Sequence, residues 1–375
     1  MSLKTPLYDA HVQAGGKMAD FAGWLMPLWY KTGQSAEHHA TRNACGLFDI
    51  CHMGEFDIEG KESLPFLSHL LSNNVEKIED GQAMYHFLLN PEGGVIDDCI
   101  LYRFSEEKWM LVVNAANMQT DLDWLNSHVP SGVSIKNISD QIAKIDLQGP
   151  LAPKLLSTWV DQETLSGLKF FRFLENADID GMQVLVSRTG YTGEVGFELY
   201  TSAKHAVDLW NTMLEEGQSF GCLPCGLGAR DTLRVEAGLP LHGHELLPDR
   251  PAIGHPWMFS LDFETEFIGK KALLDAMQSG RYVHVLPFKI HGPRKALPGW
   301  KVLQHNNEVG EVLSGVISPT LNNQPIGFFL SDVPIDAGRP LMFEKEGGAA
   351  QLKGEVANLP FTALTSRKKM SVFLD

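Results

Sequence analysis

The chain has 375 residues, of which 44% are hydrophobic and 21% are charged, and its formal net charge is -15 at pH 7. This composition is typical of an ordered globular protein with two or three domains, not of a disordered or fibrous chain. The negative charge argues against a general nucleic-acid or anionic-membrane binder, because the densest basic cluster is only Arg367, Lys368 and Lys369.

The N-terminus lacks the charged and then apolar build of a secretory signal, and no apolar run is long enough to span a bilayer. We therefore expect a cytoplasmic protein in a bacterium, or an organelle-matrix protein in a eukaryote. Five scattered cysteines do not make a disulfide framework. Cys222 and Cys225 form a single CxxC without a second pair or a histidine at ligand spacing, so no metal is expected.

Two helices and a hairpin are predicted in the first third of the chain. Ser35 begins one helix, and Ser63–Leu71 places apolar residues at helical spacing. Pro91 and the Gly93/Gly94 pair then break the chain between two apolar runs, which predicts a hairpin.

Two carboxylates, Asp97 and Asp98, follow the turn of this hairpin. Because side chains alternate along a strand, Asp97 shares a face with Val95 and Cys99, while Asp98 points to the opposite face. An ionised carboxylate among apolar neighbours is costly unless it is paired or solvated, so one of the two is a candidate ligand-facing acid. The residues alone also allow a solvated acid pair beside a turn.

The later elements give an α+β pattern. Tight connections predict antiparallel strands at 109–113, 142–148, 183–188 and 196–200, and helical spacing predicts helices at 117–125 and 226–238. Beyond Gly280 the glycine and proline spacing predicts an all-β domain. No phosphate-binding loop is present, and the His242–Glu245 stretch is better explained as a loop than as a metal site. What remains is a dispersed polar set, each member near a turn or a helix start: Asp97, Tyr191, Glu198 and Arg230.

Several stretches resemble the glycine cleavage system T-protein family of aminomethyltransferases. They include TPLYDAHVQAGG from Thr5, MADFAGWLMPLWY from Met18, LNPEGGVIDD from Leu89, RTGYTGEVGFE from Arg188 and PCGLGARDTLRVEAG from Pro224. The resemblance implies an α+β fold with mainly antiparallel sheets, in which three domains surround a central folate cleft and the last is a β-barrel or jelly roll. The implied domains are 1–52 with about 140–240, then a ferredoxin-like 53–139 with about 241–279, and finally 280–375.

The resemblance also implies a reaction. The family moves the methylene of an aminomethyl group, carried on the lipoyl arm of H-protein, to tetrahydrofolate and releases ammonia. Matched by motif, Asp97 is the expected catalytic carboxylate at the folate nitrogens, and Glu198 is expected to accept from the pterin ring. Arg230 pairs either with Glu198 or with the glutamate tail of the folate. The other residues expected to line the pocket are Met53, Tyr85, Asn114 and Tyr191.

This chain departs from the family pattern at Leu247–Trp257, where an expected acid is missing and His255 and Pro256 intrude. Two functions of different class therefore stay open. The first is an aminomethyltransferase that acts on lipoylated H-protein. The second is a folate-dependent demethylase of a small molecule, or a non-enzymatic folate-binding relative.

Overall fold

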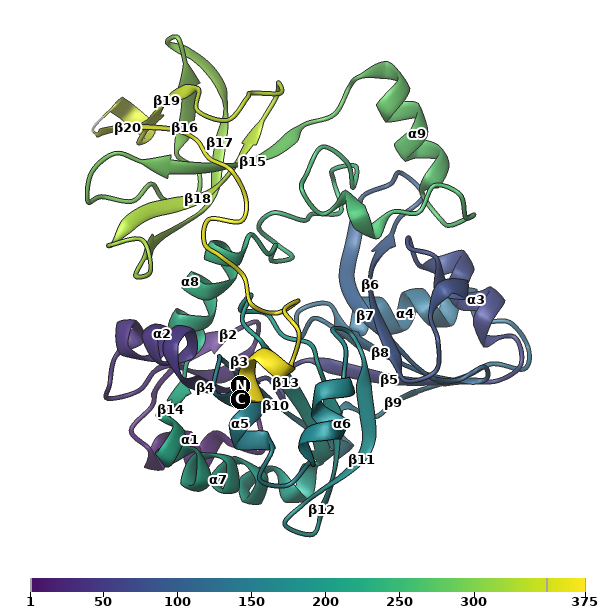
Figure 1. The fold of residues 1–375 in the computed structure, drawn as a ribbon. Coiled ribbons are helices and arrows are strands. Elements are labelled where there is room, and N and C mark those ends of the chain that lie inside the picture. Colours follow the sequence, from purple (N-terminus) through teal and green to yellow (C-terminus); the bar gives the residue numbers. More distant parts are fainter. Residues whose placement is uncertain (1, 349, 375) are drawn as a thin grey trace.

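The computed structural model describes residues 2–348 and 350–374. The chain forms a six-stranded sheet with its helices, a five-stranded sheet with its own helices, and a closed barrel, which Figure 1 shows at the bottom, at the right and at the upper left. Most strand pairs are antiparallel. The expected α+β class and the C-terminal barrel are therefore confirmed.

In the six-stranded sheet, strand β10 (Ile142–Gln148) has one apolar and one polar face. Ala143, Ile145 and Leu147 belong to the core that includes residues of α5 (Ala152–Leu156) and α7 (Ala206–Gly217). Lys144 and Asp146 therefore point to the other side. The strand order of the sheet is β11 (Phe173–Ile179), β12 (Met182–Ser187), β13 (Gly196–Ser202), β10 (Ile142–Gln148), β4 (Cys45–Asp49) and β14 (Cys222–Cys225).

Helices and a small sheet surround this six-stranded sheet. The helices are α1 (Tyr8–Gln13), α2 (Gln34–Asn43), α5 (Ala152–Leu156), α6 (Gln162–Gly167), α7 (Ala206–Gly217) and α8 (Leu227–Ala237). The small sheet has the order β1 (Leu3–Lys4), β3 (Trp24–Trp29) and β2 (Lys17–Phe21).

The five-stranded sheet contains the predicted hairpin. Its order is β6 (Gln82–Leu89), β7 (Val95–Ser105), β8 (Lys108–Val113), β5 (Gly54–Glu59) and β9 (Ser134–Asn137), with helices α3 (Ser63–Leu70), α4 (Met118–His128) and α9 (Lys270–Ser279) nearby. At the turn, a Cβ on Gly94 would lie 1.9 Å from the carbonyl oxygen of Pro248. Only glycine lets the loop after α8 approach the hairpin this closely.

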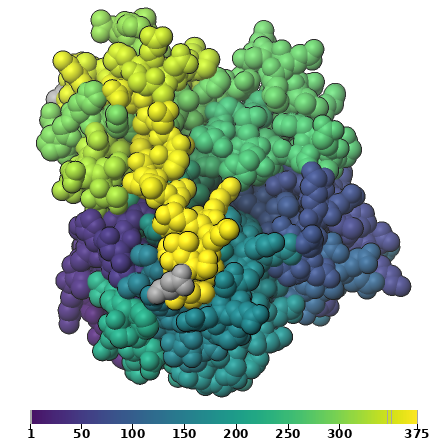
Figure 2. Space-filling model, in the orientation of Figure 1, coloured from purple at the N-terminus to yellow at the C-terminus, as the bar shows by residue number. Residues whose placement is uncertain are grey.

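The barrel closes in the order β15 (His284–Ile290), β18 (Gln324–Ser331), β17 (Asn307–Ser318), β16 (Lys301–Gln304), β19 (Pro340–Glu344) and β20 (Gln351–Val356). After β20 the chain leaves the barrel and runs back across the surface of the first sheet domain (Figure 2). It ends in α10 (Ser371–Leu374), where Met370 and Leu374 join the core of that domain. The range 280–375 therefore holds the barrel and a tail that packs elsewhere.

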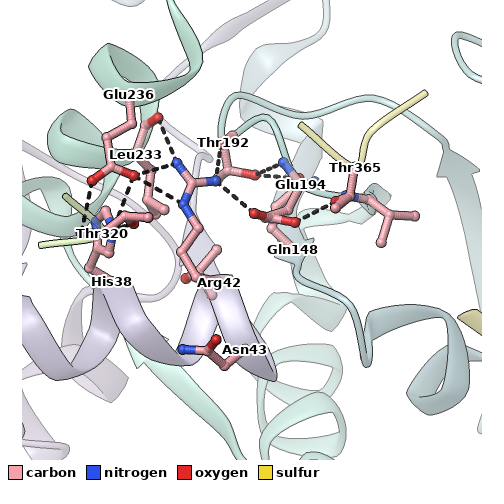
Figure 3. A network of polar contacts seen from close by, with 12 residues as sticks. His38, Arg42, Asn43, Gln148, Thr192, Glu194, Leu233, Glu236, Thr320 and Thr365 are labelled. Carbon is pink, nitrogen blue, oxygen red and sulfur yellow. Dashed lines mark hydrogen bonds and ion pairs between the residues drawn. The ribbon is translucent and has the colours of Figure 1, made fainter. Parts of the chain in front are cut away.

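A buried ionic network connects the first domain, the barrel and this tail (Figure 3). Arg42 of α2 donates Nη1 to Glu194 at 2.8 Å and Nη2 to Glu236 of α8 at 2.9 Å. Glu236 also accepts a hydrogen bond from the hydroxyl of Ser318, the last residue of β17, and from the backbone N–H of Thr320, which follows β17. Burial opposes the charged form of Glu236, but the His38, Ser318 and Arg42 contacts outweigh it and lower the pKa of Glu236 to about 2.

Candidate active site

Asp97 and Asp98 of β7 lie in opposite environments. Asp97 is fully buried on the face whose neighbours, Cys99 and Leu101, pack in the core with α3 and α4. Asp98 is only partly buried and lies on the other face. The residues alone left open which acid faces a ligand, and the family motif indicated Asp97; in the structure Asp98 is the more accessible of the two. Strand alternation separates the two acids but cannot say which face the helices cover.

Three amide N–H groups hold the Asp97 carboxylate. The backbone N–H of Asn114 donates to Oδ2 at 2.9 Å, and its side-chain amide donates to Oδ1 at 2.9 Å. The amide of Asn117 donates to Oδ1 at 2.7 Å and lies 2.8 Å from Nδ1 of His242, whose Nε2 lies 3.1 Å from the Val95 carbonyl oxygen. Asp97 is thus a fixed buried charge, and His242 has a structural partner on each nitrogen.

Asp98 is held differently. The Tyr85 hydroxyl donates to Oδ2 at 2.8 Å, and the Asn114 amide donates to Oδ1 at 2.9 Å. Burial and the charge of Asp97 together raise the pKa of Asp98 to about 7. A carboxylate with this pKa can take up or release a proton near neutral pH, which suits a general base.

Behind Asp97 lies a second buried acid, Asp121 in the first turn of α4. No amide N–H or hydroxyl group of the described residues donates to its side-chain oxygens, which interact instead with the carboxylate of Asp97. Burial, followed by the charge of Asp97, raises the pKa of Asp121 to about 10. Asp121 therefore carries its proton at neutral pH.

Glu198 of β13 has one oxygen fully engaged. Its Oε2 accepts from Thr189 at 2.9 Å, from Tyr200 at 3.0 Å and from Tyr102 at 3.3 Å. Among the described residues, none donates to its Oε1. The side chain is therefore fixed at one oxygen and leaves the other as an acceptor for a ligand.

Arg230 of α8 makes no hydrogen bond or ion pair with Glu198, the one expected partner that lies within the chain; its carboxylate partner is Asp146. Its Nη1 donates to Asp146 Oδ2 at 2.8 Å, and its guanidinium carbon lies 4.7 Å from the ring centre of Tyr191. A small pocket lined by Phe48 and Gly226 also reaches Arg230. The Tyr191 hydroxyl donates to the Pro240 carbonyl oxygen, which fixes the ring under the guanidinium.

The residues around Asp98 and those around Glu198 and Arg230 belong to one site. Burial, with the Asp98 charge adding to it, raises the pKa of Tyr191, and Tyr191 in turn adds to the raised pKa of Tyr85. Met53 is partly buried and packs both against the cluster of Tyr102 and Tyr200 and against the cluster of α8. The structure thus brings together residues that β6, β7, β13 and α8 supply.

Sequence reasoning missed the buried charges of β10 and β5. Lys144 and Glu55 are almost fully buried, with Nζ and Oε1 3.8 Å apart, and burial raises the pKa of Glu55 to about 8. Lys144 Nζ, Glu55 Oε1 and Asp146 Oδ1 all lack hydrogen bonds within the described part of the chain. The available signal was a charged residue at every second position, 144 and 146, of an otherwise apolar strand.

No group of three His, Cys, Asp or Glu side chains that could hold a metal occurs in residues 2–348 and 350–374. In the same ranges, no helix is long and apolar enough to cross a membrane.

Comparison with known proteins identifies the family. The family model described as the GCVT N-terminal domain matches residues 7–262. The aminomethyltransferase of Caldanaerobacter subterraneus subsp. tengcongensis is 46% identical over 331 residues, 88% of each chain. That of Bacillus subtilis is 40% identical over 336 residues, 88% of this chain and 91% of the relative.

A solved structure agrees with the sequence relatives. The glycine cleavage system aminomethyltransferase T from Bartonella henselae superimposes with a TM-score of 0.89 at 32% identity, and the match covers 98% of this chain and 100% of that one. These relatives favour the transferase over the demethylase and the non-enzymatic alternative. The chain therefore belongs to the aminomethyltransferase family of the glycine cleavage system, whose members use tetrahydrofolate.

Proposed function

We propose that this aminomethyltransferase binds tetrahydrofolate between the two sheet domains and transfers to it the methylene of the aminomethyl-lipoyl arm of H-protein. The observation that carries the proposal is Glu198, with Oε2 held by three hydroxyls and Oε1 free. A carboxylate oxygen in this state suits a ligand edge with adjacent N–H donors, as the pterin ring has. The relatives are bacterial, and we propose the bacterial cytoplasm as the location.

In this proposal the hairpin supplies the reactive carboxylate. Asp98 lies beside the folate nitrogens, and Tyr85 and Asn114 orient its two oxygens. The catalytic role expected for Asp97 becomes an indirect one, because Asp97 is buried and its charge adds to the effect of burial in raising the pKa of Asp98. A base with a pKa near 7 can accept a proton from an attacking nitrogen without being blocked at neutral pH.

The overall transfer is balanced without an added oxidant. The methylene carbon loses its bonds to the lipoyl sulfur and to the amine nitrogen and gains two bonds to folate nitrogens. Two protons leave those nitrogens, of which one ends on the thiol and one on ammonia. The negative charge of Asp98 stabilises positive charge that develops at the one-carbon unit.

The remaining predicted residues bind and orient. Tyr191 and Met53 offer apolar surface to the flat part of the ligand, and Arg230 offers its free N–H groups to an anionic part. The side-chain nitrogens Nε and Nη2 of Arg230 have no partner among the described residues, so they remain as donors.

Two measurements test the proposal. Titration calorimetry with tetrahydrofolate should give saturable heat. A binding free energy weaker than about -4 kcal/mol, which corresponds to a millimolar Kd, would refute the proposed folate site. Single-turnover transfer from aminomethylated H-protein should then release ammonia. Folate binding without any transfer from H-protein would support the proposed ligand but refute H-protein as the donor.

A further inference from the structure

Asp146 is the only carboxylate that holds Arg230 in the described part of the chain. The Nη1 to Oδ2 distance is 2.8 Å, and the Asp146 side chain is fully buried while Arg230 keeps 14% of its side chain exposed. The contact joins α8 to β10, which lie far apart in the sequence. It uses one edge of the guanidinium and leaves the other edge unpaired.

A second carboxylate lies close enough to compete for this arginine. Asp146 and Glu198 are directly opposite each other on β10 and β13, so both side chains point to the same face of the sheet. Burial raises the pKa of Asp146, Arg230 lowers it, and the charge of Glu198 raises it further, in keeping with the strand register and the Arg230 contact. An arginine released from Asp146 therefore has Glu198, on the neighbouring strand and the same face, as an alternative partner.

We infer that Asp146 is a positioning residue that keeps Arg230 away from Glu198, so that Glu198 Oε1 and the free edge of Arg230 both stay available to the ligand. The inference rests on the proposed folate site. It assigns the Oε1 atom of Glu198 to the N–H donors of a pterin ring, and the free N–H groups of Arg230 to the carboxylates of the glutamate tail. Without Asp146, the two recognition groups would neutralise each other.

A suppressor experiment separates this role from a direct contact. Two probes are titrated by calorimetry: tetrahydrofolate, and 6-methyltetrahydropterin, which has the ring but no tail. Asp146→Asn should weaken binding of the tail-less probe at least about tenfold, because Arg230 turns to Glu198 and covers Oε1. The double variant Asp146→Asn/Arg230→Met should restore that affinity to within about threefold of wild type, because no arginine is left to cover the oxygen.

The double variant should still bind tetrahydrofolate more weakly than wild type, since it lacks the donor for the tail. Glu194→Gln is the matched control. It removes a buried carboxylate from another arginine, Arg42, and should leave both affinities unchanged. Melting temperatures of all variants show whether each one is folded.

Three results would overturn the inference. Unchanged affinity in Asp146→Asn would show that Arg230 stays in place without it. Equal losses in the single and the double variant would show that Asp146 contacts the ligand or only supports the fold. Failure of wild type to bind either probe would refute the folate proposal itself, and with it this inference.

Discussion

Asp97 and Asp98 are neighbours on opposite faces of β7, and the buried charge of Asp97 adds to the effect of burial in raising the pKa of Asp98 to about 7. The side-chain amide of Asn114 donates to both carboxylates, at 2.9 Å each. The two acids therefore have different roles. Asp97 is held in place by amide N–H groups, and Asp98 can exchange a proton with a ligand.

This division predicts different defects for the two acids. Asp98→Asn should lower single-turnover transfer about 10²- to 10³-fold, the effect of losing one well-placed electrostatic group worth about 2.7–4 kcal/mol. Asp97→Asn should lower the free energy of unfolding by about 1–3 kcal/mol. The carboxylate that accepts three N–H groups is then replaced by a side chain with one acceptor oxygen and an NH2 group, which cannot accept. Transfer rates and urea unfolding of both variants decide the matter. A stable, inactive Asp97→Asn beside an active Asp98→Asn would return the catalytic role to Asp97.

A second prediction concerns pH. A base must be deprotonated to act, so the single-turnover rate should rise with pH and level off above an apparent pKa near 7, the value set by burial and Asp97. Asp98→Asn should flatten this limb of the profile. If the same limb persists in Asp98→Asn, the titrating group is another residue.

A third prediction tests the free oxygen of Glu198. Glu198→Gln keeps the shape but turns one acceptor into a donor, and it should cost about 1–3 kcal/mol of tetrahydrofolate binding in calorimetry. Glu163→Gln, on the exposed first turn of α6, is the control and should bind normally. Unchanged affinity together with abolished turnover would mean that Glu198 takes part in the chemistry instead of orienting the ligand.

A fourth prediction follows from the ionic network of Figure 3. Arg42→Met leaves the buried carboxylates of Glu194 and Glu236 without their cation, and should lower the free energy of unfolding by about 3–5 kcal/mol. Lys270→Met, which removes a cation from the exposed Glu266, should change it little. A loss below about 1 kcal/mol for Arg42→Met in urea denaturation would contradict the buried role.

A fifth prediction uses Asp121. Its pKa is raised to about 10 in the folded chain, whereas an unfolded Asp titrates near 3.9, so the unfolded state loses the proton first as pH rises. The acid therefore destabilises the fold increasingly between about pH 4 and pH 8. Asp121→Asn removes this penalty, and its melting temperature should exceed that of wild type at pH 8 by more than at pH 4. Asp123→Asn, exposed two residues later, should show no such trend.

Local pattern predicted the elements but not the contacts between them. The hairpin, the strand at Ile142–Gln148 and the helix before Gly238 follow from turn residues and periodicity, and each forms as expected. The partner of Arg230 could not be predicted in this way, since Asp146 lies on a strand of another segment and only tertiary packing brings the two together. The same holds for Asp97, because its burial depends on α3 and α4 covering that face of the sheet.

The return of the tail to the first domain has a consequence for synthesis. Leu7 and Leu374 share one hydrophobic core, and Arg188 donates to the carbonyl oxygens of Ser366 and Lys368. During translation the core of the N-terminal domain therefore stays incomplete until the segment that follows the barrel has been made. Without the segment after the barrel, the core surface that Met370 and Leu374 cover in the folded molecule would be left open to water.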